Sequence, residues 1–466
     1  MSRIQLRPRP HSSSADAGFS LIEVMVAMFI FAVVSLAFAS ALLTTMQVSS
    51  DSLARQTASS LAAGQIDQVR TTTDLTALDS SSAPTDVTVA GRKYHISTIV
   101  RWTGAGSGTD AQCSSGSGPL LNKAVKVVVS WDGMATSTLP AEADTVVAPK
   151  SRISDVNKGV IIVSVKNAQG AGNAAVTILV VPNPTAPNGA SAISATIDPT
   201  DAQGCGYVLN VTPGKYDVSI SKAGTSTPSV DIAQSTTPKQ TVDVSAGSTA
   251  TAPFQFDQSA TYIPHYASNV AGAVVLPLTM DTTFVNTYGI FTTVSTPTRL
   301  HPFTAGYAVL AGSLGANGGT ASNCLAVDPG AWPVATDATG TWAGKRPDAV
   351  AAAPGGSADA YVPMGAVAVT GPANGYVSAA AQTTGPAGSG NPGCAVPKTY
   401  LIKLPATGTA VVALPFGSWK LTSGTTSGSQ TTKVTASQLA LVTRGTMGTA
   451  NGDAVVTLDP RQLVTP

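Results

Sequence analysis

The chain has 466 residues, a net charge of +1 and 11% charged residues, well below the ~25% usual in soluble domains. So neutral a sequence offers no basic patch for nucleic acid, and its 43% hydrophobic residues exclude a chain that is disordered through charge. At roughly 150 residues per domain, the length predicts about three domains.

An apolar run begins at Phe19 and continues to Leu43, and it contains one carboxylate, Glu23. The run is long enough to span a bilayer. A charge inside such a run is costly unless it finds a partner, so Glu23 is a functional residue by default. Gly18 lies directly before the run, and basic residues precede it at Arg3, Arg7 and Arg9.

The order of basic leader, Gly18, Phe19 and Glu23 resembles the class III signal of type IV prepilins and type II secretion pseudopilins. The resemblance implies that a prepilin peptidase cuts on the cytoplasmic side, between Gly18 and Phe19, and methylates the new amino terminus of Phe19. It also implies a single-pass protein of the cell membrane with a cytoplasmic leader, residues 1–18. After cleavage the protein would be displayed at the cell surface or in an extracellular filament.

Glu23 lies about one helical turn after Phe19, a rise of roughly 6 Å. In a staggered bundle of helices, the carboxylate of an incoming subunit can neutralise the amino terminus of its neighbour, which compensates two buried charges at once. We therefore expect Glu23 to be a filament-assembly residue, with other pilins or pseudopilins as its partners.

Two other readings of the N-terminus are a secretory signal and a plain membrane anchor. A secretory signal would also show a basic region and an apolar core, and Ala37-Phe38-Ala39 offers a small-x-small cleavage site after that core. The charge of Glu23 would be unfavourable in the apolar core of a secretory signal or of a plain anchor, and neither interpretation explains Gly18-Phe19.

Beyond the membrane run, apolar residues recur every three to five positions, at Ala54, Ala58, Leu61, Ala62, Ile66 and Val69. This spacing predicts one helix over residues 19–70, roughly 78 Å long, whose second half lies on a globular head. No proline interrupts it. The segment from Ala58 to Arg70 resembles minor pilins of the pilus-modification type and the I-type pseudopilins.

Residues 71–150 are expected to form a pilin-like antiparallel β head. Ring and aliphatic residues alternate from Tyr94 to Trp102 and again from Val125 to Trp131, the period of a half-buried strand. The stretch from Glu142 to Lys150, with prolines nearby, is expected to be the exit linker.

Residues 151–254 begin with the apolar strand from Gly159 to Val165 and contain Pro213-Gly214-Lys215-Tyr216-Asp217-Val218. This pattern resembles the carboxypeptidase-regulatory and Cna-B-like modules, which are small transthyretin-like β-sandwiches. A Gly-x-aromatic-x-aliphatic string recurs at Gly417-Ser418-Trp419-Lys420-Leu421, so residues 361–466 are expected to form a second, degenerate sandwich. Residues 255–360 are β-rich without an assigned fold, and the whole chain is predicted to be α+β, with mainly-β C-terminal domains.

The four cysteines follow the membrane segment and therefore lie outside the cytoplasm, where two disulfides are favoured and three connectivities are open. Closure of the loop-rich stretch between Cys324 and Cys394 predicts one bridge there. Cys113 and Cys205 would then form the second bridge or remain buried thiols.

Catalysis finds no support in the sequence. The histidines are scattered without a metal-ligand spacing, and neither a nucleophile elbow nor a phosphate-binding loop is present, so we expect no enzyme, cofactor or metal site. Trp332, Trp342 and Tyr361 lie in loop-like sequence, where exposure would indicate adhesion and burial would indicate packing.

The sequence thus predicts a minor pilin or pseudopilin with an enlarged β-rich region, assembled near the tip of a surface filament and able to bind a surface ligand. The alternative is a membrane-anchored surface protein that binds a ligand without entering a filament.

Overall fold

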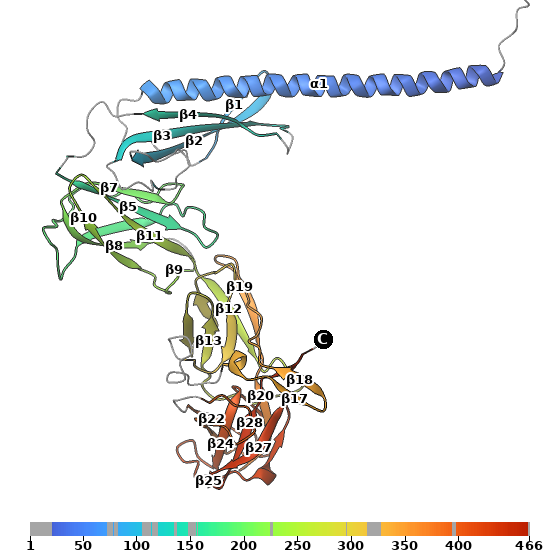
Figure 1. The fold of residues 1–466 in the computed structure, drawn as a ribbon, viewed down its shortest axis with the longest axis vertical. Coiled ribbons are helices and arrows are strands. Elements are labelled where there is room, and N and C mark those ends of the chain that lie inside the picture. Colours follow the sequence, from blue (N-terminus) through green and yellow to red (C-terminus); the bar gives the residue numbers. More distant parts are fainter. Residues whose placement is uncertain are drawn as a thin grey trace, which may run out of the picture. The chain divides into compact units, whose positions relative to one another are not determined.

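The computed structural model describes residues 21–71, 78, 83–104, 113, 120–134, 138–147, 155, 157–223, 227–294, 296–314, 328–393 and 398–464. The chain divides into two compact units, one of Met1–Arg101 with Lys123–Ala148, and one of Trp102–Asn122 with Pro149–Pro466. The predicted α+β class is confirmed, with one long N-terminal helix followed by many β-sheets (Figure 1).

Helix α1 spans Leu21–Thr71 without interruption, as the absence of proline predicted. Its segment Val24–Thr71 is long and apolar enough to cross a membrane by length and composition, since it contains an 18-residue window with a mean hydropathy of 2.6. The later half of α1 packs on the first unit's sheet through small and aliphatic residues at the predicted spacing: Ala54, Ala58, Ala62, Ile66 and Val69.

The head sheet has the order β1-β2-β3-β4. Its strands are β1 (Thr85–Val89), β2 (Arg92–Gly104), β3 (Leu120–Trp131) and β4 (Ala141–Val147). The residues that alternate in the sequence form the face against α1, since Tyr94, Ile96, Val100, Val125, Val127, Val129 and Trp131 are buried in one core with the helix.

The expected exit linker from Glu142 is wrong, because Glu142 to Val147 lie in β4, which pairs antiparallel with β3. Small residues make this strand: Ala141 is buried against α1. On the other face, the Glu142 carboxylate lies 2.9 Å from Lys126 Nζ.

The next lobe is a β-sandwich of two sheets, β10-β8-β6 and β7-β5-β11-β9. Its strands are β5 (Gly159–Lys166), β6 (Thr177–Pro182), β7 (Cys205–Val211), β8 (Gly214–Ser221), β9 (Ser229–Asp231), β10 (Lys239–Val244) and β11 (Thr249–Gln258). Apolar side chains of both sheets form one core that includes Phe256, so this sandwich extends past the expected boundary at residue 254.

Residues from 260 form a third lobe around two three-stranded sheets, β15-β12-β19 and β14-β13-β16. Its elements are β12 (Ala260–Tyr266), β13 (Thr282–Val285), β14 (Ile290–Thr293), β15 (Thr298–Leu300), β16 (Ala308–Ala311), η1 (Pro329–Ala331), β17 (Ala335–Asp337), β18 (Gly340–Ala343) and β19 (Ser357–Val362). Edge-to-face contacts among Tyr262, Phe284 and Tyr307 fill its core.

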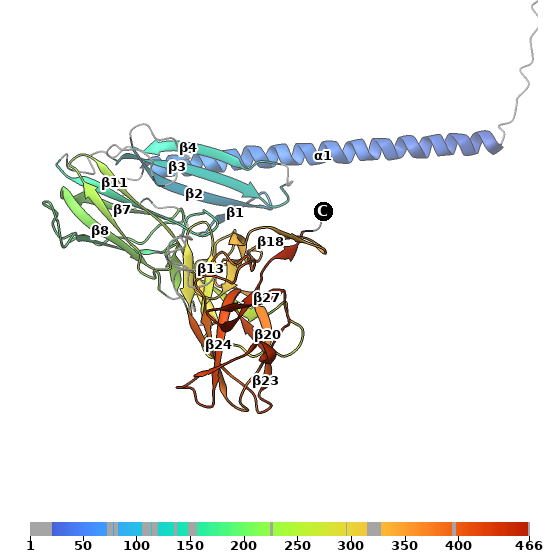
Figure 2. The same cartoon turned by 60° about the horizontal axis from the view of Figure 1, so that its bottom comes forward.

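The C-terminal lobe is a second sandwich, with sheets β23-β20-β26 and β22-β21-β24-β28-β27 (Figure 2). Its elements are β20 (Gly365–Thr370), β21 (Tyr376–Ala381), β22 (Thr399–Lys403), β23 (Thr409–Leu414), β24 (Gly417–Gly424), β25 (Thr432–Lys433), η2 (Ala436–Gln438), β26 (Leu439–Leu441), β27 (Gly445–Ala450), β28 (Asp453–Leu458) and β29 (Gln462–Leu463). The last strand, β29, leaves this lobe and pairs with β18 of the third.

The two sandwiches share the local structure around the repeated Gly-x-aromatic string. Gly214 and Gly417 begin β8 and β24 with φ of 152° and 141°, a region that favours glycine. Two residues later, Tyr216 Oη donates to the Thr212 carbonyl at 2.9 Å, and Trp419 Nε1 donates to the Pro415 carbonyl at 2.9 Å. The sandwiches differ where a third strand joins, because β11 pairs parallel with β5 whereas β26 pairs antiparallel with β20.

Candidate functional site

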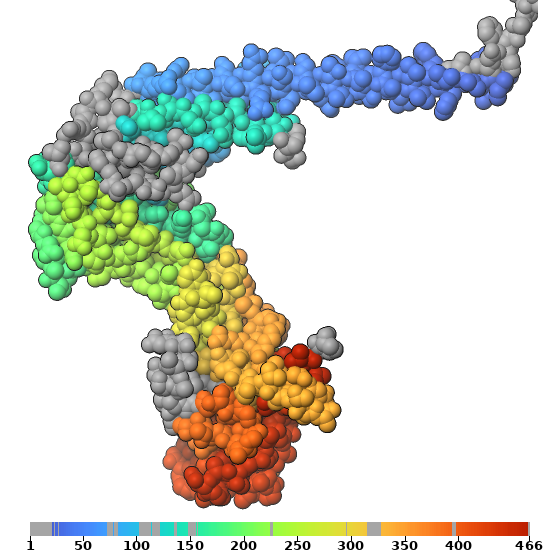
Figure 3. Space-filling model, viewed as in Figure 1, coloured from blue at the N-terminus to red at the C-terminus, as the bar shows by residue number. Residues whose placement is uncertain are grey.

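The expected processing site lies at the start of the chain, and Gly18 and Phe19 fall outside the described residues. Glu23 lies in the first turn of the described part of α1. From this turn to Leu53, α1 exposes nearly all of its large apolar side chains, for example Leu21, Phe31 and Leu42. In Figure 3 this dark-blue part of the helix extends beyond the head sheet, uncovered on the face in view. So much apolar surface needs lipid or other protein around it.

The rest of α1 is held firmly. Ala54, Ala58 and Ala62 are fully buried, and their small side chains let the head sheet approach the helix backbone. One arginine holds the helix to the sheet at each end of this contact. Arg70 donates to Thr145 Oγ1 at 3.0 Å, and Arg92 of β2 donates to Ser50 Oγ at 2.9 Å. The exposed half of α1 continues without interruption from the half that is fixed on the head.

The head also carries a charged cluster around His95 of β2. Its Nδ1 lies 2.6 Å from Asp86 Oδ1, and its Nε2 lies 3.1 Å from Asp132 Oδ1. Both contacts raise the pKa of His95, and the contact with Asp132 is the larger cause. Lys93 and His95 lower the pKa of Asp86. The cluster joins β1, β2 and the turn after β3, and within the described residues no three His, Cys, Asp or Glu side chains gather as a metal site.

A disulfide joins Cys113, between β2 and β3, to Cys205 at the start of β7. This is the pairing considered in the sequence as the second bridge. The other expected pair, Cys324 and Cys394, lies outside the described residues.

The three aromatic residues considered for ligand binding differ in how far they are exposed. Trp332 is 3% exposed and packs in the interior. Trp342 of β18 lies beneath the Arg444 guanidinium, 3.8 Å from the ring centroid. Tyr361 of β19 is 67% exposed. The alternation of Ala358, Ala360 and Val362 was the available signal, since it places Tyr361 on the opposite, outward face of a strand.

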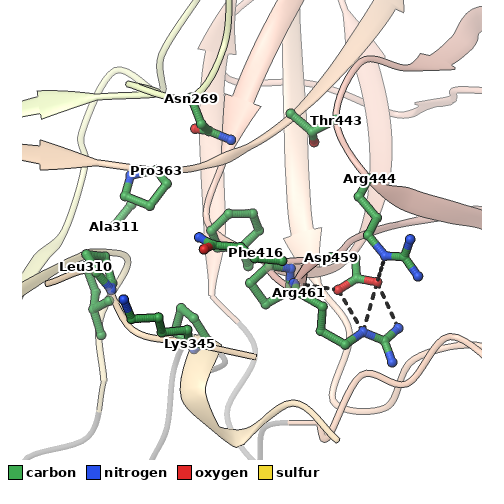
Figure 4. Close-up of a pocket in the computed structure, with 14 residues that line it drawn as sticks. Asn269, Leu310, Ala311, Lys345, Pro363, Phe416, Thr443, Arg444, Asp459 and Arg461 are labelled. Carbon is green, nitrogen blue, oxygen red and sulfur yellow. Dashed lines mark hydrogen bonds and ion pairs between the residues drawn. The ribbon is translucent and has the colours of Figure 1, made fainter. Parts of the chain in front are cut away.

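A cavity of about 170 Å³ lies where the third and C-terminal lobes meet, lined in part by Arg444, Asp459 and Arg461 (Figure 4). The Asp459 carboxylate accepts hydrogen bonds from Arg461 Nη2 at 2.8 Å and from Arg444 Nε at 3.0 Å. Arg444 also donates to Asp337 of β17 at 3.0 Å. The carboxylate is therefore fully engaged by protein donors, and this cluster fastens β17 and the C-terminal segment rather than presenting charge to a ligand.

The comparisons with known proteins concern mainly the N-terminus. The prokaryotic N-terminal methylation motif matches residues 13–39, which include Gly18, Phe19 and Glu23. No curated protein matches the chain. The N-terminal sequence indicates a protein that is processed like a type IV pilin and anchored in the membrane by its N-terminal helix.

Among solved structures, the Bacillus anthracis TIE protein is 10% identical, with 79% of this chain and 72% of that chain covered and a TM-score of 0.18. A Streptococcal ancillary pilin is 8% identical, with 69% and 72% covered and a TM-score of 0.17. At TM-scores this low, the likeness supports no inference about this chain.

Proposed function

We propose that the chain is a minor type IV pilin or pseudopilin, an assembly protein rather than an enzyme. A prepilin peptidase cuts after Gly18 and methylates Phe19, and the mature subunit enters a surface filament through α1. The observation that carries the proposal is the methylation motif, which runs into a helix whose first half is uncovered and whose second half is fixed in the head.

Glu23 supplies the electrostatic part of assembly. The uncovered half of α1 leaves the bilayer for a bundle of similar helices during assembly. The Glu23 carboxylate must keep a counter-charge there, because an unpaired charge in an apolar surrounding is strongly unfavourable. The amino terminus of a neighbouring subunit is the cation that cleavage creates. The apolar surface of α1 supplies the rest of the association energy.

The β lobes after residue 150 favour a low-copy position at the tip. Three lobes with packed cores follow the four-stranded head, and so bulky a subunit resists repeated incorporation in a dense helical array. We infer that the two sandwiches serve as spacer modules of the Cna-B-like kind and that the lobes present an adhesive surface. The alternative, an anchored ligand-binding protein outside any filament, keeps the same lobes and loses the role of Glu23.

The test expresses the full chain in cells that make the filament and compares three variants. Mass spectrometry of the wild type is expected to find an N-methylated Phe19 as the first residue. Gly18→Leu is expected to leave an uncut precursor in the membrane. Glu23→Ala is expected to be cut normally and to be lost from the sheared filament fraction.

Glu142→Ala is the matched control, because Glu142 is the chain's only other glutamate and makes one ion pair with Lys126 on the head surface. It should enter filaments like the wild type. A mature chain that begins near Ser40 would overturn the processing. Normal incorporation of Glu23→Ala would remove Glu23 from the assembly mechanism, and absence of the wild type from the filament fraction would favour the alternative.

A further inference from the structure

The outward face of the sheet β15-β12-β19 is an exposed polar surface with one aromatic ring, Tyr361, on its edge strand β19. Alternate residues of the three strands point to this side, while Tyr262, Ala360 and Val362 point into the core. We define the Tyr361 face as the exposed residues Ile263 and His265 of β12, Arg299 of β15, and Asp359 and Tyr361 of β19.

The Tyr361 ring is held in place before any ligand arrives. β12 and β19 pair in parallel, with Ile263 opposite Asp359 and His265 opposite Tyr361. The His265 ring stacks on Tyr361 with centroids 5.3 Å apart and planes 25° apart. His265 Nε2 lies 2.8 Å from Asp359 Oδ1, which fixes the imidazole in turn. One face of the tyrosine is covered by histidine, and the side chain remains 67% exposed.

We propose that the Tyr361 face binds a sugar ring of a surface glycan. A pyranose presents one face of C–H groups, which stacks on an aromatic ring, and a rim of hydroxyls, which pair with carboxylate, imidazole and guanidinium groups. Tyr361 offers the ring, and Asp359 and His265 offer the polar groups beside it, whereas Arg299 lies further along the face, opposite Thr261. Placement on paired strands limits the ordering cost of binding.

The size and charge of the face decide against a protein as the occupant. A stable protein interface covers about 800 Å² on each partner and has an apolar centre. Here only Tyr361 and Ile263 are exposed apolar side chains, and Ile263 is 38% exposed. One carboxylate, one imidazole and one guanidinium leave the face nearly neutral, which suits an uncharged sugar. The inference rests on the adhesive role proposed above.

The test is saturation-transfer NMR on the purified full chain in a zwitterionic detergent that contains no sugar headgroup. The probes are the methyl β-glycosides of galactose, glucose and N-acetylglucosamine. At least one is expected to receive saturation, mainly at its ring C–H protons. Tyr361→Ala is expected to weaken that binding about tenfold, Asp359→Asn is expected to weaken it less, and Tyr361→Phe is expected to retain it.

Tyr288→Ala is the matched control. Tyr288 is also exposed in this lobe, at 57%, but its ring stacks on Phe303 with centroids 4.6 Å apart, away from the Tyr361 face. The control should bind like the wild type. Saturation of none of the three glycosides, equal binding by Tyr361→Ala, or equal loss in both tyrosine variants would overturn the proposal.

A second copy on this face is a further outcome. Self-association that Tyr361→Ala abolishes in sedimentation would assign the face to contact between subunits and would overturn the sugar site. Because these measurements use the purified chain, their failure leaves the processing and filament tests untouched.

Discussion

Gly214 and Gly417 illustrate how a single residue type fixes the start of a core strand. Both have φ values in the glycine region, and both precede a buried aromatic whose polar atom donates to a carbonyl four residues earlier. The repeated string was visible in the sequence because this geometry needs glycine and an amphipathic ring at a fixed spacing. Burial of Trp332 depends on tertiary packing, so its loop-like sequence did not reveal it, whereas the exposure of Tyr361 could have been predicted from the alternation of Ala358, Ala360 and Val362.

Gly214→Ala is expected to destabilise the first sandwich. A Cβ at this position would lie 2.2 Å from the Ala190 backbone nitrogen, and the φ of 152° is itself strained for alanine. We expect a loss of about 3 kcal/mol or more in the local free energy of unfolding. Hydrogen exchange with mass spectrometry on peptides from β7 and β8 measures it. Gly428→Ala, where the new Cβ has no neighbour within 4 Å, should leave exchange unchanged. Equal hydrogen-exchange protection of β7 and β8 in both variants would contradict the close approach of Ala190 to Gly214.

The elements were predictable where their periodicity is local. The helix spacing from Ala54 to Val69 and the alternation in β2, β3 and β8 each indicated a buried face. The continuous apolar run of β5 indicated a strand that is buried on both faces. Residues 255–360 resisted assignment because several of their strands are only three or four residues long and because β12 pairs with β19, far along the chain. β4 was mistaken for a linker because its buried positions are alanine and threonine, which carry little hydrophobic signal.

The head sheet is expected to lose stability as pH rises through the His95 transition. His95 has a raised pKa in the folded head, so its contribution is fully present below its ordinary value near 6.5 and disappears as pH passes the raised value. Asp86 has a lowered pKa, so its contribution is present above its ordinary value of 3.8 and is lost in stronger acid. The cluster therefore stabilises most between these two ordinary values.

The measurement is thermal proteolysis of the full chain, followed through peptides of β1 to β4. The melting temperature of the wild-type head should exceed that of His95→Gln at pH about 5.5, and the difference should shrink by pH about 8.5. Asp132→Asn should reduce the pH dependence, since Asp132 is the first cause of the raised His95 pKa. A difference that is constant over this range would show that the carboxylates do not hold the imidazolium.

At the scale of the whole molecule, a disulfide fastens the segment between β2 and β3 to the first sandwich, within the second compact unit. The chain passes from Val147 of β4 to Gly159 of β5, and the disulfide links Cys113 to Cys205, 92 residues apart. Closing a loop of this length restricts the unfolded chain by about 4.5 kcal/mol in the loop-entropy model. Four exported cysteines predicted bridges, but only the folded chain brings these two together.

The bridge can be tested by cutting the chain between its two cysteines. A specific protease site inserted after Lys150 lies between Cys113 and Cys205 in the sequence, so both cleavage fragments hold one of these cysteines. After cleavage, the fragments should migrate together in a non-reducing gel and separate on reduction. The variant with Cys113→Ser and Cys205→Ser should separate at once. The matched variant with Cys324→Ser and Cys394→Ser should stay joined, because its remaining cysteines are the bridged pair. Separation of the wild-type fragments without reductant, or a mapped peptide joining Cys205 to Cys324 or Cys394, would contradict the Cys113–Cys205 bridge.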